Sequence, residues 1–327
     1  MTICGTGRNA TAQIGIGRGY GKTILIGDMF VYLGVPAVVS AIPQHTLAVV
    51  REGGERGWTL LDNRREVPGY KEAKRDQQIC SINDIFDALG LSDRGELRLE
   101  IELGGDLVVG SGIGASAASC VAIVRALNEK FVLGLSEDEV NHAAWHGEFA
   151  YHSKPSGIDN TASCFGGVFV FRQDPSTGNN EIERLRLAQA VEAVLVNSGV
   201  TVDTAGKRTH INAFERREPT KFASYLELIS AQAVAMKEAL VCSDLREVGR
   251  IMNENHRLLI DMDLSHPEIV HMAQLATEEG AWGAKVTGGG RGGYMLALTP
   301  GGELQDRVAS RFERRGYITV KTKIGAV

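Results

Sequence analysis

Few features of this sequence point to a disulfide framework or a cysteine-bound metal. The 327-residue chain has five cysteines, Cys4, Cys80, Cys120, Cys164 and Cys242. They are scattered, odd in number and never spaced as C-x-x-C, which argues against both disulfide bonds and a zinc site. The pattern predicts reduced, mostly packed cysteines in a cytoplasmic protein.

Excess positive charge is also absent. The formal net charge is -5, which gives no general attraction for nucleic acid or for an anionic membrane. The sequence shows neither clustered Lys and Arg nor a nucleic-acid recognition motif. We therefore expect no nucleic-acid partner, and any anionic ligand must be bound by local positive groups.

Long apolar runs and repeats are missing as well. No apolar run approaches about 18 residues, so no membrane span is expected. The segment MTICGTGRNA at the start lacks the apolar core of a signal peptide. Hydrophobic content of 43% and charged content of 23% are ordinary for a globular protein, and this length is sufficient for two packed domains.

The first hundred residues contain mainly strand patterns. Residues 22–26 form a short apolar run between glycines, and residues 46–50 and 58–61 predict a hairpin turned by the glycines between them. Residues 97–103 alternate leucine or isoleucine with charged side chains, which is the period of a half-buried strand.

Helical spacing dominates after residue 114. Residues 116–132 predict one helix, and Ser136 with Glu139 predicts a capping box that starts a second helix. This second helix should run to about Tyr151 and break at Pro155. Residues 167–171 then return to strand, and the polar stretch 173–180 is the best candidate for a linker. Further strands are expected at 192–197, 284–287, 293–298 and the end of the chain, and helices near 219–240, 243–261, 266–279 and 303–314.

This mixed order of helices and strands is typical of an α+β protein. We expect two domains, spanning residues 1–175 and 176–327. A doubly wound parallel sheet is not expected, because strands and helices do not alternate regularly.

Two glycine patterns near residue 20 imitate nucleotide-binding motifs. Gly15 to Gly21 lacks the glycine that G-x-G-x-x-G requires at position 20, where the chain has Tyr20. Gly21-Lys22-Thr23 ends like a Walker loop, but that motif requires glycine where the chain has Ile16. In both cases a strand follows instead of the required helix, so we reject both interpretations.

The segment 110–118 is a stronger candidate, because its glycines and small residues directly precede a predicted helix. Such a loop brings backbone N–H groups against a phosphate, and the helix dipole adds to the attraction. The hydroxyl of Ser116 is placed to reach a phosphate-bound Mg²⁺. A tight strand-to-helix turn explains the same residues, so this segment alone leaves both alternatives open.

Two carboxylates and a second glycine run complete the candidates. Glu148 on a helix and Asp159 after a Pro-Ser-Gly turn provide a metal ligand and a base, although solvated surface carboxylates are the alternative. The five glycines in residues 288–293 are costly to order, which favours close backbone approach over a plain turn. His142, His146 and His152 are expected to be helix-surface residues.

Together these segments resemble the three signature motifs of the GHMP kinases. Residues 21–41 look like the first motif, 110–118 like the second and 285–293 like the third. Within that superfamily, the P-S-G-I-D-N of residues 155–160 is similar to the mevalonate kinases. The resemblance implies a two-domain α+β fold with a ferredoxin-like C-terminal domain. It also implies ATP-dependent phosphorylation of an alcohol, with mevalonate and isoprenoid precursor synthesis as the leading expectation.

The resemblance also assigns roles to individual residues. Lys22 and Asp159 match the catalytic pair, and Ser116 and Glu148 match the Mg²⁺ ligands. The ATP-phosphate loop would comprise Gly110, Ser111, Gly112, Ile113, Gly114, Ala115 and Ser116. The substrate side would comprise Lys22, Asp28, Asp159, Thr204 and Gly289.

The chain departs from the family pattern in ways that bear on the acceptor. Asp28 and Met29 stand where the family usually has Glu and His, Ala115 replaces the commoner first serine of motif two, and Arg291 replaces a small residue. Another GHMP kinase acting on a different mevalonate position, a phosphomevalonate or a sugar is therefore an alternative. A catalytically silent ATP-binding regulator is a further alternative, and a homodimer is compatible with either.

Overall fold

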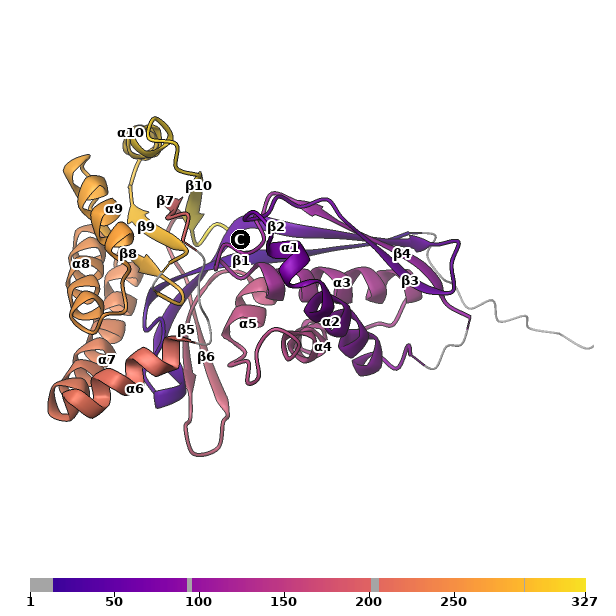
Figure 1. Ribbon diagram of the computed structural model, residues 1–327. Helices are drawn as coiled ribbons and strands as arrows, with labels where there is room; N and C mark the ends of the chain where they lie inside the picture. The colour runs from indigo at the N-terminus through magenta and orange to yellow at the C-terminus, as the bar shows by residue number, and fades with distance from the viewer. Residues whose placement is uncertain (1–13, 93–95, 201–205, 291) are drawn as a thin grey trace, which may run out of the picture.

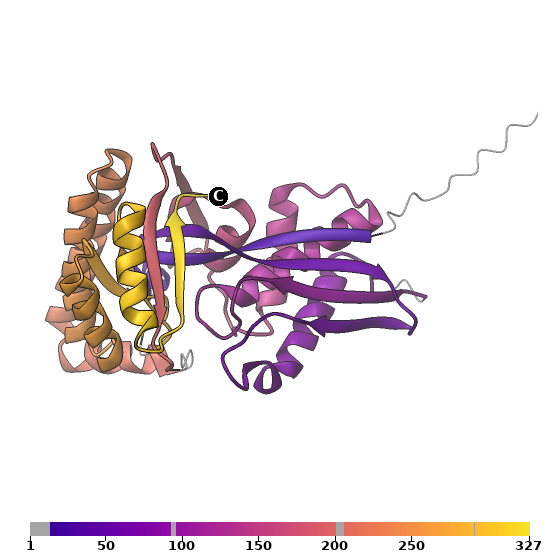
Figure 2. The same ribbon diagram turned by 90° about the horizontal axis from the view of Figure 1, so that it is seen from above.

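The computed structural model describes residues 14–92, 96–200, 206–290 and 292–327. Their strands form two sheets, each with helices packed against it (Figure 1). Both views place helices α8 (Leu245–Asp261) and α9 (Pro267–Glu278) at one end of the molecule and strands β3 (Gly57–Asp62) and β4 (Arg98–Gly105) towards the other (Figure 2). The expected α+β class is confirmed. Within the described ranges, no helix is long and apolar enough to cross a membrane.

The first sheet is built around the long strand β2. Strand β1 pairs antiparallel with β2 along one edge, while β5 and β4 pair with successive stretches of the other edge. Outside these, β3 runs parallel to β4 and β6 runs antiparallel to β5. The strands of this sheet are β1 (Ile14–Ile26), β2 (Ala37–Glu52), β3 (Gly57–Asp62), β4 (Arg98–Gly105), β5 (Val168–Gln173) and β6 (Asn180–Leu185).

The predicted hairpin of residues 46–50 and 58–61 is wrong, although both segments are strands. Strand β4 lies between β2 and β3, so these two strands never pair. The glycine loop that joins them crosses the end of β4, where the N–H groups of Gly53 and Gly57 donate to the carbonyls of Arg98 and Leu97, each at 2.7 Å. The chain does reverse at the glycine loop, as predicted. However, β4, which comes later in the chain, pairs with β2 and β3 in place of their pairing with each other.

The predicted linker at residues 173–180 is also wrong. Gln173 and Asn180 are paired across the hairpin of β5 and β6, so the polar stretch is its turn. Strand β6 continues the first sheet to Leu185. The division of the chain near residue 175 stays a prediction.

The glycine segment of residues 15–21 is part of β1, so neither nucleotide motif has the loop that it requires. Alternate glycines of this strand face helix α3 (Ala115–Phe131). A Cβ atom built on Gly17 would lie 2.1 Å from the carbonyl oxygen of Ala122, and one on Gly19 would lie 2.1 Å from that of Ala118. The absence of side chains therefore lets α3 pack directly onto the strand.

Most of the remaining helices beside the first sheet carry parts of the cavity described below. Helix α4 (Glu137–Glu148) has the predicted capping box between Ser136 and Glu139, and it ends three residues before the predicted Tyr151. Helix α2 and the short helices were not predicted: three of them lie in the first hundred residues, where mainly strands were expected, and α5 follows Pro155, where a helix was expected to break. They are η1 (Val31–Leu33), α1 (Tyr70–Ala73), α2 (Arg75–Ala88) and α5 (Ile158–Phe165).

The second sheet has the order β10-β7-β9-β8. All of its strands and the helices α7 to α10 were predicted to within a few residues, whereas α6 was not. The strands are β7 (Val191–Asn197), β8 (Gly283–Thr287), β9 (Tyr294–Leu298) and β10 (Thr319–Ile324). The helices not yet bounded are α6 (Gly206–Arg217), α7 (Pro219–Val241) and α10 (Gly302–Glu313).

One buried apolar cluster joins the two halves of the chain. Leu25, Ile26 and Phe30, at and after the end of β1, belong to the same cluster as Phe222 of α7 and Met295 of β9. The rings of Phe30 and Phe222 meet edge to face with centroids 6.4 Å apart. The end of β1 is thus embedded among C-terminal elements, which fixes the position of the residues that precede it.

Candidate active site

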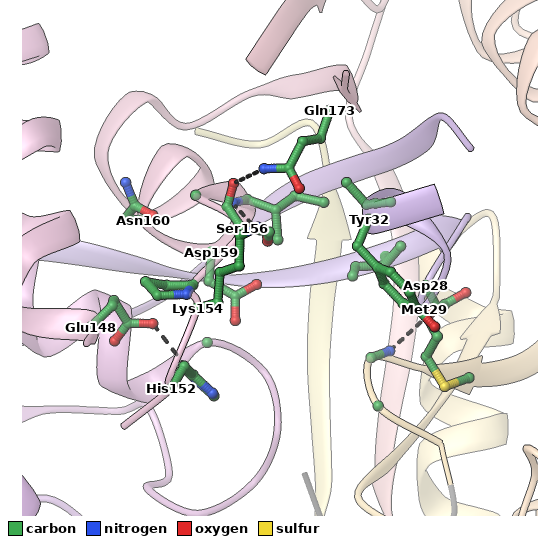
Figure 3. Close-up of a pocket in the computed structure, with 18 of the residues that line it drawn as sticks. Asp28, Met29, Tyr32, Glu148, His152, Lys154, Ser156, Asp159, Asn160 and Gln173 are labelled. Atoms are coloured by element: carbon green, nitrogen blue, oxygen red, sulfur yellow. Dashed lines mark hydrogen bonds and ion pairs between the residues drawn. The ribbon is translucent and has the colours of Figure 1, made fainter. Parts of the chain in front are cut away.

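A cavity of about 580 Å³ lies where the two halves meet. Its walls come from β1, the loop before α3, the end of α4, the start of α5, the turn of the β5–β6 hairpin and the glycines after β8. Figure 3 shows Glu148, His152 and Asp159 on one side and Asp28, Met29 and Tyr32 across from them. Segments far apart in the sequence therefore converge on one space.

The two residues predicted as the catalytic pair are in contact. Lys22 projects from β1, and its Nζ lies 3.2 Å from Oδ1 of Asp159. Asp159 stands in the first turn of α5, two residues after Gly157, whose φ of 90° suits a residue without a side chain. The side chain of Lys22 is 5% exposed and that of Asp159 is 27% exposed, so water or a ligand reaches the carboxylate first.

The predicted phosphate loop is tied to Lys22. Gly110, Gly112 and Gly114 all have φ near 80°, and the N–H of Lys22 donates to the carbonyl of Ile113 at 2.9 Å. A Cβ on Gly114 would lie 2.9 Å from Cγ of Lys22, so only glycine permits this approach. The loop and the lysine thus form one rigid unit.

The loop residues differ in what they present to the cavity. Gly110, Gly112, Gly114, Ala115 and Ser116 line it. Ser111 and Ile113 are buried beneath the loop, and the hydroxyl of Ser111 donates to the carbonyl of Val108 at 2.5 Å. These two side chains support the loop from below and do not face a ligand.

Glu148, at the end of α4, is a buried carboxylate with no strong cationic partner of its own. Its pKa is raised to about 8, mainly by burial and then by the charge of the nearby Asp159, although hydrogen bonds from Ser116 and Cys120 and the charge of Lys22 act in the opposite direction. Nε2 of His152 lies 3.9 Å from Oε2 of Glu148. A buried carboxylate beside a serine hydroxyl is a donor set that suits Mg²⁺, which prefers oxygen ligands.

Asp28 lines the cavity, but its carboxylate is occupied. Nζ of Lys285 lies 2.5 Å from its Oδ2, and the N–H of Gly288 donates to its Oδ1 at 2.8 Å. Gly289 also lines the cavity. Thr204 and Arg291, the other residues expected near the substrate or phosphates, lie outside the described residues.

Several residues of the cavity were not singled out from the sequence. Lys154 brings a second lysine, after Lys22, to the wall, directly before the Pro-Ser-Gly turn. Gln173 and Asn180, at the base of the hairpin turn, direct their side-chain amides to the carbonyl of Ser156 at 3.5 and 3.0 Å. Lys154 directly precedes the Pro-Ser-Gly turn that was singled out, so the sequence could have indicated it. The contacts of Gln173 and Asn180 depend on the pairing of β5 with β6, which was not predicted.

The histidines follow the expectation in part. The rings of His142 and His146 on α4 meet edge to face, with centroids 4.8 Å apart. His152 instead lines the cavity beside Glu148. Among the residues with described positions, no group of three or more His, Cys, Asp or Glu side chains is arranged to hold a metal. Any cation here would need ligands from hydroxyls or from a bound molecule.

The sequence of this chain is similar to those of known kinases. Residues 79–167 match the family of GHMP kinases N terminal domains, and residues 236–318 match that of GHMP kinases C terminal domains. Mevalonate kinase from Arabidopsis thaliana is 30% identical, with 94% of this chain and 97% of that protein covered. Mevalonate kinase from Thermococcus gammatolerans is 28% identical over 93% of this chain and 94% of that protein.

A solved structure of a mevalonate kinase is also similar to this chain. The crystal structure of L. major mevalonate kinase in complex with R-mevalonate superposes with a TM-score of 0.90 at 33% identity, covering 95% of each chain. Sequence likeness and fold likeness therefore extend over nearly the whole length of both proteins. The chain belongs to the GHMP kinase family, as the phosphate loop, the buried glutamate and the lysine–aspartate pair of its cavity had indicated.

Proposed function

We propose that this kinase transfers the γ-phosphoryl group of ATP to the 5-hydroxyl of mevalonate, giving 5-phosphomevalonate for isoprenoid precursor synthesis. The observation that carries the proposal is the contact of Lys22 with Asp159 beside a glycine loop suited to phosphate. Relatives named mevalonate kinase that align over nearly the full chain, one of them solved with R-mevalonate, support this choice of acceptor.

In the proposed reaction, Asp159 orients the substrate hydroxyl and accepts its proton on a carboxylate oxygen. The hydroxyl oxygen forms the new bond to the γ-phosphorus as the bond to the β,γ-bridging oxygen breaks, and ADP leaves. Lys22 holds Asp159 in place and supplies positive charge beside the transferred group. Such positioning and charge compensation are the main requirements of phosphoryl transfer.

The backbone of residues 110–116 would bind the ATP phosphates, because the loop lies directly before the N-terminus of α3. Glu148 and the hydroxyl of Ser116 would hold Mg²⁺. When bound, the ion neutralises phosphate charge and fixes the phosphates in position. The raised pKa of Glu148 supports this role, since a buried carboxylate of this kind lacks the positive charge that would stabilise its ionised form.

The part of the cavity that would bind the acceptor alcohol is compatible with more than one alcohol. Met29, Val31, Tyr32, Ile158 and Ile211 make this wall largely apolar. An apolar wall suits the methyl-bearing carbon chain of mevalonate better than a sugar with a hydroxyl on every carbon. A different acceptor alcohol is still the second candidate, because Met29 removes a polar group from this wall. Asp28, Gly289 and Thr204 are proposed on the same side.

The test is ADP release by the purified protein with ATP, Mg²⁺ and (R)-mevalonate. We expect saturable turnover, with NMR of the product showing phosphate on the 5-oxygen. A panel of phosphomevalonate, galactose and homoserine would be run in parallel. Turnover of another alcohol without turnover of mevalonate would reject the acceptor but keep the kinase. No turnover of any alcohol, with normal ATP binding, would favour a regulatory ATP-binding protein.

A cytoplasmic location and a homodimer are further parts of this proposal. The scattered cysteines support the location, since the described ones are all free thiols. Sedimentation of the purified protein would test the dimer. Fractionation of cells that produce the protein would test the location.

A further inference from the structure

The side chain of Asp28 lies beneath the glycine loop that follows β8. Both its carboxylate and the ammonium of Lys285 have 0% of their side-chain surface exposed. Oδ2 of Asp28 lies 2.5 Å from Nζ of Lys285, and Oδ1 accepts the N–H of Gly288 at 2.8 Å. Each carboxylate oxygen therefore has a partner within this chain.

The lysine is equally engaged. Its Nζ also donates to the carbonyl of Val286 at 2.7 Å. Burial lowers the pKa of Lys285, and the charge and hydrogen bond of Asp28 oppose that shift. A charge this deep in the protein persists because its partner is beside it, and removing one partner alone leaves an uncompensated charge.

A second set of hydrogen bonds, close to the first, joins β1 to β8. The hydroxyls of Thr23 and Thr287 are 3.0 Å apart, and the N–H of Ile24 donates to the Thr287 hydroxyl at 2.8 Å. That hydroxyl lies 3.1 Å from the carbonyl oxygen of Ile24. The start of the third glycine motif is thus attached to the residues immediately after Lys22.

Gly288 is the point at which this attachment reaches the catalytic groups. A Cβ atom built on it would lie 3.1 Å from the carbonyl oxygen of Gly112 and 3.8 Å from Nζ of Lys22. Its φ is 80°, which favours glycine. The N–H that Asp28 accepts is therefore on the residue that touches both the phosphate loop and the catalytic lysine.

We propose that Asp28 is a positioning residue, which acts with Lys285 to hold residues 288–290 against Lys22 and the phosphate loop, and that it does not bind the acceptor alcohol. The proposal rests on the proposed kinase function of this cavity. It replaces the expectation that Asp28 is a substrate ligand, because an aspartate with both oxygens bound and no exposed side-chain surface has nothing to offer a substrate. Asp159 differs, since 27% of its side chain is exposed.

A double-mutant cycle separates the two roles. The variants are Asp28→Asn, Lys285→Met and the pair combined, measured for kcat, for the KM of the alcohol and for melting temperature. A positioning pair predicts that each single variant lowers kcat by about tenfold or more while the alcohol KM changes less than about threefold. It also predicts that the combined variant recovers kcat to within about threefold of the parent, because no unpaired charge then remains.

The control is another ion pair between the two halves of the molecule that lies away from the cavity. Lys237 of α7 contacts Glu183 of β6 at 2.5 Å, and both side chains are partly exposed. Lys237→Met should leave kcat and both KM values unchanged. Loss of activity in this control as well would show that any break between the halves impairs turnover, which would overturn a specific role for Asp28 and Lys285.

A substrate ligand predicts a different pattern. Asp28→Asn would then raise the alcohol KM by tenfold or more, and adding Lys285→Met would not restore it. If the single variants do not fold, the kcat and alcohol KM of the combined variant still distinguish the two roles, because this variant removes both charges and is expected to fold. If the parent does not phosphorylate mevalonate, the acceptor in the proposed function is rejected, and the same comparison is made with the alcohol that the parent does use.

Discussion

At the scale of single residues, the carboxylates of the cavity differ in what accompanies their charge. Asp159 lies beside Lys22, and Asp28 is paired with Lys285. Glu148 has the neutral donors Ser116 and Cys120 and a histidine nitrogen at 3.9 Å, and the charge of Lys22 affects its pKa less than these donors do. The three residues are therefore suited to different tasks, namely handling a proton, holding a loop and binding a cation. Mutation of each should affect a different measured quantity.

Replacement of Asp159 by Asn removes the proton acceptor and keeps the shape of the side chain. We expect kcat to fall by about 10²- to 10⁴-fold, the usual contribution of a positioned acid or base. Affinity for ATP, measured by calorimetry, should change little. Asp138→Asn, in the exposed first turn of α4, is the control and should behave as the parent. Retention of full turnover by Asp159→Asn would exclude the proposed role.

Replacement of Glu148 by Gln tests the cation site. The concentration of Mg²⁺ that gives half-maximal turnover should rise by more than about tenfold, because a neutral amide is a poorer ligand for a hard cation than a carboxylate. Glu303→Gln, on an exposed turn of α10, serves as the control. An unchanged Mg²⁺ requirement in Glu148→Gln would show that the ion is held elsewhere.

Sequence reasoning singled out most of these residues but not all of their partners. Lys22, Asp159 and Glu148 were singled out because each lies in a recognisable motif, and their roles stay predictions. Asp28 was placed on the substrate side by resemblance, and its engagement by Lys285 depends on a residue 257 positions away. Contacts at that separation are set by the packing of the two sheets, which no local pattern in a single sequence encodes.

At the scale of elements, the pairing of β1 with α3 determines where the phosphate loop stands. The glycines of β1 bring the helix onto the strand, and the same strand carries Lys22. Helix α3 begins at Ala115, at the end of the phosphate loop. The glycines that imitate a nucleotide motif therefore contribute to the site through packing.

A methyl group at Gly17 should disturb that packing. Its Cβ would lie 2.1 Å from a backbone oxygen of α3, so the helix must shift. We expect Gly17→Ala to lower the free energy of unfolding by about 1 to 3 kcal/mol or more, measured by urea denaturation. Gly104→Ala, in β4, has open space around the new atom and should change stability by less than about 0.5 kcal/mol. Equal effects of the two variants would contradict the packing role.

Elements with strong local signals were predicted well. Helix α3, the capping box of α4 and the alternating strand β4 each follow from the residues within them. The two elements that were assigned wrongly, the hairpin of β2 with β3 and the linker at 173–180, both depend on which strand pairs with which, whereas the missed helices were simply not predicted. A turn-forming sequence specifies that the chain reverses but leaves open which neighbour fills the free edge.

At the scale of the whole molecule, one buried histidine couples stability to pH. His256 of α8 bonds to the hydroxyl of Ser265 at 2.8 Å. Burial, together with the charge of Lys285, lowers its pKa from 6.5 to about 3. Between these values the unfolded chain binds a proton that the folded protein does not, so stability rises with pH in this window and is lost as the pH falls below about 6.5.

His256 alone contributes a slope of up to about 1.4 kcal/mol per pH unit between pH 6 and 4.5 to the free energy of unfolding. The buried Glu148, whose pKa is raised to about 8, contributes a slope of opposite sign in this range, but it does so equally in the parent and in the histidine variants. His256→Gln keeps a group that can bond to Ser265 and has no proton to gain, so its slope should be smaller by about that amount. His271→Gln, on the outer face of α9, is the control and should keep the slope of the parent. Identical slopes in all three proteins would contradict the assignment.

The apolar cluster shared by the two halves has a consequence for how ligands enter. Because Phe30 and Phe222 pack together in it, swinging the halves apart about a hinge would expose buried rings to water. Entry and release should therefore depend on smaller local movements of the rim, of which the turn at residues 174–178 is the most solvent-exposed part.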